Sequence, residues 1–343
     1  MTSSLLSAEL IDLHPRPADL RRLVQAGMAR RPRQLPAWLL YDAEGSRLFE
    51  LICEQPEYSL TRTETALLDQ EAGAIAAAVA TELPAAGGAA RGRAALVEFG
   101  AGNARKVGPL LDALRPAAYA ALDISAEHLA MACQRLQQAH PRVPVLGICC
   151  DYSAMAELPS HPLVEGRPRI GFYPGSSIGN FTPGEAMALL AQFRRLLGPG
   201  GVLLIGIDQP RAVERLEAAY NDAAGVSAAF ARNLLVRLNR DLQGTFDPTL
   251  FHYEARWQPA RSRIAMALVS CCEQTVELAG ERWRFAAGEP LISEYSVKYS
   301  TAAFGAVAAA AGWQVRQRWR DPAGELSLQL LVGRDSHRSH PVP

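Results

Sequence analysis

The sequence has 343 residues, 35 basic and 35 acidic side chains, and is 49% hydrophobic. This length exceeds what one hydrophobic core usually fills, so we expect a large α/β domain with a smaller second domain. Balanced, scattered charge argues against nucleic acid as a partner, and no stretch reaches the roughly 18 apolar residues of a membrane span. The first residues lack a basic region followed by an apolar one, so we expect a cytoplasmic protein, and we favour a monomer.

The cysteines give no indication of a metal site. None of the six is arranged with C-x-x-C or Cys/His ligand spacing. We therefore expect no metal and interpret them as buried free thiols, the usual state in the cytosol. They are Cys53, Cys133, Cys149, Cys150, Cys271 and Cys272.

The first part of the chain is predicted to be helical. The helices run from about residue 17 to 83, most clearly over 63–83, and the Gly-, Ala- and Arg-rich stretch 84–93 is predicted to be a surface linker. From residue 94, short apolar runs alternate with helical patterns at 104–114, 126–139 and 183–197. This alternation, which ends at Asp208, predicts five parallel strands.

After Asp208 the alternation stops. Helical runs at 212–224 and 227–242, followed by period-two segments near 251–257 and 263–270, predict an inserted subdomain. A helix at 301–311 and a terminal β-hairpin around the turn at 321–324 complete the pattern, and the tail from about residue 335 is expected to be disordered. A mostly parallel, Rossmann-like sheet that ends in an antiparallel strand resembles the class I S-adenosylmethionine (SAM)-dependent methyltransferase fold.

The turn after the first predicted strand indicates a nucleoside site. Gly100 and Gly102 of Gly-Ala-Gly-Asn103 allow a sharp turn and close approach of a ligand, and Glu98 lies just before it. A G-x-G pair is weak evidence alone, but Arg105 replaces the third glycine that a dinucleotide site would favour. Asp123 follows the second strand, where it is placed for ribose hydroxyls or for capping a helix. Asp151 and Tyr152 follow the third strand, where they are placed for adenine.

Several longer segments resemble one family, the L-histidine Nα-methyltransferases that form hercynine in ergothioneine biosynthesis. The matching segments span about residues 36 to 333. They are 40–50 (LYDAEGSRLFE), 56–64 (PEYSLTRTE), 172–181 (FYPGSSIGNF), 218–226 (AAYNDAAGV), 261–266 (RSRIAM) and 293–299 (SEYSVKY).

The resemblance implies SAM as cofactor and free histidine as substrate, with three successive methyl transfers. It implies a discontinuous amino-acid-binding domain of α+β type (15–73 and 211–298) beside a methyltransferase domain (74–210 and 299–336), followed by a disordered tail (337–343). The implied cofactor contacts are Glu98, Gly100, Gly102, Asn103, Lys106, Asp123, Asp151 and Tyr152. The implied substrate-binding and catalytic residues are Tyr41, Tyr58, Gly175, Asn180, Tyr220, Met266, Glu294 and Ser296.

The resemblance also assigns roles within that pocket. Asn180 and Tyr220 would bind the substrate carboxylate, Glu294 and Ser296 the two imidazole nitrogens, and Tyr41 would orient the amine. A phenol with a pKa of about 10 is a poor base at neutral pH, so we expect positioning to dominate catalysis.

Two residues depart from the family pattern. The family usually has Asn at position 295 and Tyr at 297, where this chain has Tyr295 and Val297. If the segment is a strand, both point away from Glu294 and Ser296 and alter packing only. Otherwise they could reshape the pocket, which would either lower activity or admit another amino acid such as an aromatic one. A different free amino acid, or a non-catalytic SAM- or amino-acid-binding protein, therefore stays an alternative.

Overall fold

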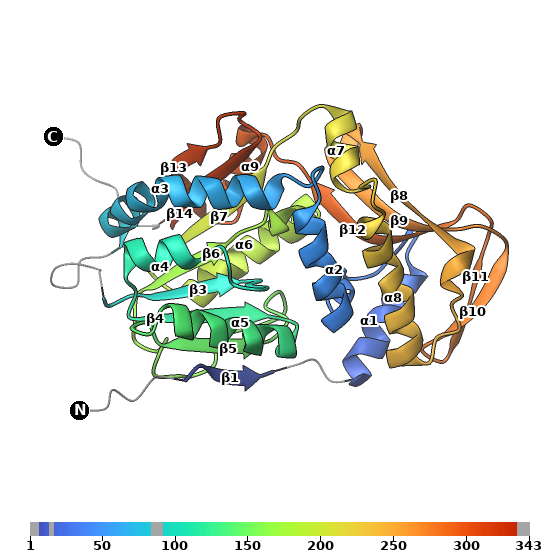
Figure 1. Cartoon of the computed structure of the whole chain (residues 1–343), viewed down its shortest axis with the longest axis horizontal. Helices are drawn as coiled ribbons and strands as arrows, with labels where there is room; N and C mark the ends of the chain where they lie inside the picture. The colour runs from blue at the N-terminus through green and yellow to red at the C-terminus, as the bar shows by residue number, and fades with distance from the viewer. Residues whose placement is uncertain (1–6, 14–16, 84–91, 335–343) are drawn as a thin grey trace.

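An eight-stranded sheet forms the larger part of the protein (Figure 1). The computed structural model describes residues 7–13, 17–83 and 92–334. In spatial order the strands are β1 (Glu9–Asp12), β5 (Val145–Cys149), β4 (Ala118–Asp123), β3 (Ala95–Phe99), β6 (Arg169–Tyr173), β7 (Val202–Asp208), β14 (Leu326–Gly333) and β13 (Trp313–Arg320). Strands β1 to β7 in this order pair in parallel, whereas β14 is antiparallel to both β7 and β13. The predicted class I fold and its terminal hairpin are confirmed.

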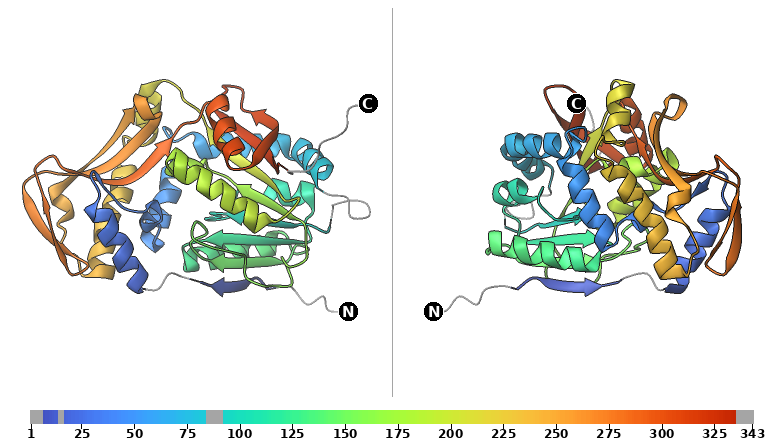
Figure 2. Two further views of the ribbon diagram at one scale, coloured as in Figure 1. Left: turned by 180° about the vertical axis from the view of Figure 1, so that it is seen from behind. Right: turned by 45° about the vertical axis from the view of Figure 1, so that its right-hand side comes forward.

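Helices cover both faces of this sheet, as expected for parallel strands that are buried along their whole length (Figure 2). On one face lie α3 (Leu60–Glu82), α4 (Gly108–Leu114) and α5 (Ala126–Ala139), and on the other α6 (Pro183–Leu197) and α9 (Thr301–Ala310). The carboxyl ends of β3, β4, β5 and β6 therefore open at one edge, where α/β sheets bind ligands.

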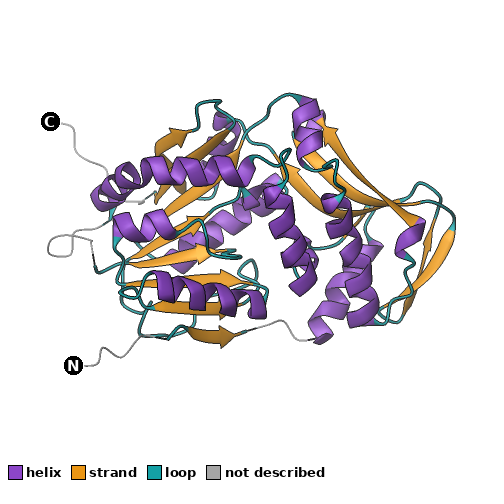
Figure 3. Cartoon of the chain, viewed as in Figure 1, coloured by secondary structure: helices purple, strands orange, loops and turns teal. Residues whose placement is uncertain are grey.

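A second, four-stranded sheet stands beside that edge (Figure 3). Its order is β2 (Arg33–Gln34), β12 (Pro290–Val297), β9 (Arg263–Ser270) and β8 (Phe251–Gln258), and a hairpin of β10 (Gln274–Leu278) and β11 (Glu281–Phe285) extends from it. The helices near it are α1 (Pro17–Ala29), α2 (Ala43–Glu54), α7 (Val213–Ala219) and α8 (Val226–Leu242). Short 3₁₀ segments are η1 (Ala37–Leu40), η2 (Ser177–Asn180), η3 (Pro248–Leu250) and η4 (Pro259–Arg261).

The proposed division into two domains does not coincide everywhere with these sheets. The expected boundary after residue 73 falls inside α3, a single helix that packs on α4 and β14 of the large sheet. Strand β1 lies before residue 15 but pairs with β5. The division therefore remains a prediction.

Two predicted helices have different bounds. The helix expected over 104–114 begins only at Gly108, because Ala104 has a left-handed φ of 53° and Pro109 favours the first turn of a helix. The helix expected over 212–224 ends at Ala219, and the Asp222 carboxylate instead accepts the backbone N–H groups of Val226 and Ser227 at the start of α8. Residues 84–91 of the expected linker and the tail from 335 lie outside the described residues.

None of the six cysteines, all of which lie within the described residues, forms a disulfide, but the expectation that they are buried is wrong for Cys271, which is exposed. Cys133, Cys149 and Cys150 are buried, and Cys53 and Cys272 are partly buried. No helix within the described residues is long and apolar enough to cross a membrane.

Candidate active site

The turn after β3 has the sharp geometry that its glycines predict. Gly100 and Gly102 have φ values of 70° and 54°, and the N–H groups of Gly100 and Ala101 both donate to Leu122 O of β4. A Cβ on Gly100 would lie 3.3 Å from the Tyr152 hydroxyl, whereas a Cβ on Gly102 would meet nothing within 4 Å. The backbone at Gly102 therefore faces open space that a ligand can approach.

Asp123, at the end of β4, is tied to this turn. Its Oδ2 accepts Gly102 N–H at 2.8 Å and its Oδ1 accepts Ser125 N–H at 3.1 Å. Burial raises the pKa of Asp123, and the two backbone hydrogen bonds oppose that rise. Each carboxylate oxygen keeps a lone pair, which is what two vicinal hydroxyl groups of a ribose require.

The other predicted cofactor residues surround the same turn at different depths. Glu98 is 1% exposed and accepts the Tyr119 hydroxyl at 2.6 Å, and burial raises its pKa to about 8. Asn103 donates to Glu50 of α2 at 3.0 Å. Asp151 accepts the N–H and hydroxyl of Ser153, and Tyr152 packs edge-on against Phe99 at the end of β3. Glu98 thus lies beneath the turn, while Asp151 and Tyr152 lie at its rim.

A buried carboxylate joins the cofactor turn to the next loop. Glu64 of α3 is 0% exposed, accepts the Lys106 ammonium at 2.6 Å, and accepts Gly175 N–H at 2.8 and 2.9 Å. A Cβ on Gly206 would lie 2.0 Å from Glu64 Oε1, so only glycine leaves room for this carboxylate. Glu64 therefore fixes Lys106 and Gly175 relative to each other.

All eight predicted substrate residues line one pocket between the two sheets. Its walls come from η1, α2, the β6–η2 loop, the segment after α7, α8, and strands β8, β9 and β12. The lining residues are Leu40, Tyr41, Phe49, Ile52, Tyr58, Gly175, Ser176, Ser177, Asn180, Tyr220, Ser227, Phe230, Ala231, Tyr253, Met266, Ser293, Glu294 and Ser296.

At the centre of this pocket, Asn180 and Glu294 are in contact. Asn180 Nδ2 donates to Glu294 Oε1 at 2.6 Å, and burial raises the pKa of Glu294 to about 8. The contact depends on Gly179 in η2, because a Cβ there would lie 2.7 Å from the Val297 carbonyl oxygen. Glycine thus allows η2 to pack on β12 and brings the two side chains together.

Hydroxyl groups and aromatic rings form the rest of the wall. The Tyr220 and Ser296 hydroxyls lie 2.8 Å apart. Tyr41 packs edge-on against Phe49, and Tyr58 against Tyr220. Burial raises the pKa of Tyr41 and Tyr58 well above their usual value, so both phenols stay protonated near neutral pH.

The two departures from the family pattern point away from the pocket, as the strand periodicity predicts. Tyr295 packs with Ala265, Ala267, Val269 and Ile292, and the Arg263 guanidinium lies 3.3 Å from its ring centroid. Val297 belongs to the core of the large sheet. Neither side chain lines the cavity.

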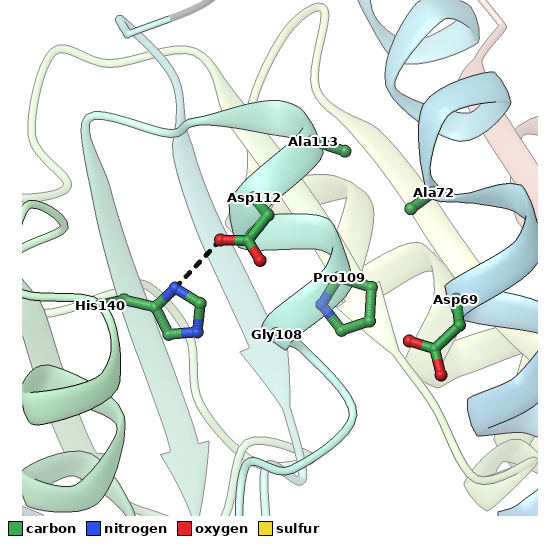
Figure 4. Close-up of a pocket in the computed structure, with 7 residues that line it drawn as sticks. All are labelled: Asp69, Ala72, Gly108, Pro109, Asp112, Ala113 and His140. Atoms are coloured by element: carbon green, nitrogen blue, oxygen red, sulfur yellow. Dashed lines mark ion pairs between the residues drawn. The ribbon is translucent and has the colours of Figure 1, made fainter.

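Another hollow lies on the outer surface beside α3 and α4 (Figure 4). Asp69, Asp112 and His140 are its titratable lining residues, and His140 Nδ1 lies 3.3 Å from Asp112 Oδ1. Asp112 is 76% exposed, and none of the predicted site residues lines the hollow. Among the described residues, no group of three or more His, Cys, Asp or Glu side chains could hold a metal ion.

Sequence reasoning assigned no role to two buried residues beside the pocket, Glu64 and Lys298. Both stand inside the family segments. Lys298 is two residues after Ser296, so the period of a strand could have placed it on the same side.

The chain is similar to known proteins along most of its length. The family model described as "Histidine-specific methyltransferase, SAM-dependent" matches residues 20–333. Histidine N-alpha-methyltransferase of Mycolicibacterium smegmatis is 37% identical over 319 residues, which cover 91% of this chain and 94% of that protein. The Mycobacterium tuberculosis protein of the same name is 35% identical over 320 residues, which cover 91% and 94%.

A third relative is a much longer protein. Ergothioneine biosynthesis protein 1 of Neurospora crassa is 34% identical over 212 residues, 61% of this chain and 23% of that protein. The family model spans residues 20–333, which include every residue that lines the pocket and every strand of both sheets except β1. The chain therefore belongs to the histidine-specific, SAM-dependent methyltransferase family and is an amino-acid methyltransferase.

Proposed function

We propose that the protein methylates the α-amino nitrogen of free L-histidine three times in succession, giving trimethylhistidine (hercynine) for ergothioneine biosynthesis. One observation supports this most strongly: Asn180, Tyr220, Glu294 and Ser296 line a single pocket although they come from separate parts of the chain. Amide, hydroxyl and carboxyl groups are the partners that a zwitterion with an imidazole ring requires.

The cofactor turn fits SAM. Asp123 would bind the ribose hydroxyls, Gly100 and Gly102 would allow the backbone to approach, and Asp151 with Tyr152 would bind adenine. Lys106 would bind the cofactor's carboxylate, and Glu98 would support the turn from below together with Asn103. Bound SAM supplies an electrophilic methyl group, and the protein supplies its alignment.

In the substrate pocket, Asn180 and Tyr220 would bind the carboxylate of histidine. Glu294 would accept an imidazole N–H, Ser296 would bond the other ring nitrogen, and Met266 with Tyr58 would pack on the ring. The Asn180–Glu294 hydrogen bond can persist, because Asn180 Nδ2 has a second proton and Glu294 a second oxygen for the ligand. Leaving either group unpaired in a buried site costs about 1–3 kcal/mol, which favours histidine over analogues that lack one partner.

Methyl transfer to nitrogen needs a deprotonated amine and an in-line approach. Tyr41 would orient the amine, and water would take its proton. Alignment of nitrogen, methyl and sulfur in a pocket with little water would lower the free-energy barrier of the reaction by up to about 7–11 kcal/mol. Gly175, without a side chain, leaves room for the growing ammonium group beside Tyr41 and Phe49.

The test is incubation of the purified protein with SAM and a panel of free amino acids, followed by mass spectrometry. Histidine should gain three methyl groups, with mono- and dimethyl species appearing first. Methylation of another amino acid in place of histidine would assign a different substrate. Binding of SAM and histidine without any product would instead indicate a non-catalytic binding protein.

A further inference from the structure

A buried lysine stands directly behind the polar wall of the pocket. The side chain of Lys298 is 0% exposed, and its Nζ donates to the Tyr220 hydroxyl at 2.6 Å and to the Ser296 hydroxyl at 2.8 Å. The same ammonium lies 4.6 Å from the centre of the Tyr220 ring. Lys298 does not itself line the pocket, so any effect on a ligand must pass through these two hydroxyls.

The protons and lone pairs of the two hydroxyls limit which hydrogen bonds they can form with a ligand. An ammonium can only donate, whereas each hydroxyl has one proton and two lone pairs. Tyr220 and Ser296 each use one lone pair for Lys298, and one of them donates to the other across 2.8 Å. One hydroxyl proton is then left over, and the oxygen that carries it has both lone pairs occupied. That hydroxyl can only donate, so it requires an acceptor atom on the ligand.

The charges around Lys298 make this donor favourable for an anion. Lys298 forms an ion pair with Asp208 Oδ2 at 2.6 Å, and Arg211 forms one with Asp208 Oδ1 at 2.5 Å. Arg211 and Arg215 also pair with Glu325. This cluster contains three cations and two carboxylates, which leaves one positive charge. Burial lowers the pKa of Lys298, but Asp208 and Tyr220 raise it more, so the pKa lies above its usual value.

Two titratable groups beside the hydroxyl pair, Glu294 and Tyr253, add no full negative charge at neutral pH. Glu294, on the same strand, has a pKa raised to about 8 by burial and is mostly protonated at pH 7. Tyr253 of β8 donates to the Tyr220 carbonyl oxygen, and burial raises its pKa far above neutrality. Lys298 therefore places an ammonium group directly behind the Tyr220–Ser296 end of the pocket.

We propose that Lys298 is the positioning residue for the carboxylate of the amino-acid substrate: Ser296 then donates to Tyr220 and keeps one lone pair for the imidazole ring, the Tyr220 hydroxyl donates to the carboxylate, and Lys298 supplies the positive charge behind both hydroxyls. This inference rests on the proposed function. This arrangement lets a cation stabilise the substrate carboxylate without lying next to the α-amine. The Lys298 ammonium lies behind the two hydroxyls and attracts the ligand carboxylate through them. The hydroxyls keep the ammonium out of contact with the α-amine, which is nucleophilic only when it is neutral.

The test compares two ligands that differ only at the carboxylate. Binding of histidine and of histidinol, in which CH₂OH replaces the carboxylate, is measured by calorimetry in the presence of S-adenosylhomocysteine. The wild type should prefer histidine, and Lys298→Met should reduce the ratio of the two affinities by about tenfold or more, because a hydrogen bond to a charged group is the stronger kind. In turnover assays, KM for histidine should rise more than kcat falls.

Two further variants control for structural damage. Arg211→Met removes another cation of the same cluster but touches neither hydroxyl, so it should lower the affinity ratio clearly less than Lys298→Met does. Lys298→Met combined with Asp208→Asn removes both charges of the buried pair, so that no unpaired carboxylate disturbs folding; it should show the same reduced ratio as the single variant.

Three results would overturn the inference. The first is an unchanged ratio in Lys298→Met or, if that variant does not fold, in the double variant. The second is an equal loss in Arg211→Met, and the third is an equal loss of affinity for S-adenosylhomocysteine. If the wild type methylates histidine and replacing Lys298 leaves the histidine-to-histidinol affinity ratio unchanged, only this inference fails. If the wild type neither binds nor methylates histidine, both the proposed function and this inference are wrong.

Discussion

Asn180 Nδ2 and Glu294 Oε1 lie 2.6 Å apart although 114 residues separate them in the chain. Asn180 belongs to η2 beside the large sheet and Glu294 to β12 of the small one, so this contact joins the two sheets at the pocket. The packing of Gly179 on Val297 makes the approach possible. A ligand that binds here therefore contacts both sheets at once.

Replacement of Glu294 by alanine should weaken histidine far more than SAM. The imidazole N–H would lose its buried acceptor, and the dissociation constant for histidine should rise about 10- to 100-fold. Affinity for SAM, measured by calorimetry on the same sample, should stay within about threefold. The exposed carboxylate variant Glu277→Ala serves as control. Equal weakening of both ligands would count against the assigned pocket.

The raised pKa of Glu294 should make stability depend on pH. Its folded pKa is about 8, compared with about 4.3 unfolded. For an acid whose folded pKa is raised, the stabilising contribution is complete below the unfolded pKa and is lost as pH rises towards 8. The Tm of Glu294→Gln minus that of the wild type should therefore increase between pH 5 and 8 and then level off. Taking this difference removes the contribution of Glu98, whose pKa is also about 8. A flat difference in thermal scans would contradict the assignment.

Gly100→Ala should damage the cofactor site. The residue has a φ of 70° and its new Cβ would lie 3.3 Å from the Tyr152 hydroxyl, so we expect a loss of stability of about 1 kcal/mol or more and weaker SAM binding. Gly184→Ala is the matched control, because Gly184 lies in α6 with nothing within 4 Å of the added carbon. That change should leave stability within about 1 kcal/mol, or raise it. Denaturant melts and calorimetry of both variants decide the matter.

Glu64→Gln should lower activity although residue 64 lines neither site. One carboxylate oxygen becomes an NH₂ group, which then faces the donors Lys106 or Gly175 N–H, and the loop between the two sites should lose its fixed position. We expect kcat/KM for histidine to fall by about tenfold or more. Asp69→Asn, exposed on the same helix and in the outer hollow of Figure 4, should retain full activity. The opposite ranking in steady-state assays would make that hollow the better candidate site.

Restoring the family residues at 295 and 297 should not change substrate choice. Tyr295 and Val297 point away from the pocket, so Tyr295→Asn should leave the preference for histidine over tyrosine or phenylalanine within about threefold. Val297→Tyr should instead destabilise the protein by about 1–3 kcal/mol, because the larger ring overpacks a buried position. A competition assay with mixed amino acids would detect a change in substrate preference. Such a change would mean that residues on the face of β12 opposite the pocket control substrate choice.

The sequence was most informative where its pattern was long or chemically specific. Five parallel strands, the terminal hairpin and helices such as 126–139 follow from hydrophobic period and turn residues, and the structure confirms them. The alternation of side chains along a strand also placed Tyr295 and Val297 on the face opposite Glu294 and Ser296. The eight pocket residues came from the family segments, because no single one of them stands out by its own chemistry.

Other features depend on distant contacts that a local pattern does not carry. Strand β1 has only four residues and is defined by its pairing with β5. The late start of α4 depends on the left-handed backbone at Ala104, although Pro109, a residue typical of the first turn of a helix, could have indicated it. The buried charges of Glu64 and Lys298 become meaningful only when their partners, Gly175 and Asp208, are brought in by the fold.

Two glycines limit how this pocket can be redesigned. Gly179 and Gly206 leave no space for even a methyl group, because the Val297 carbonyl and the Glu64 carboxylate occupy it. Any engineering for bulkier amino acids must therefore begin at other lining residues, such as Phe230 or Met266, where a shorter side chain creates volume.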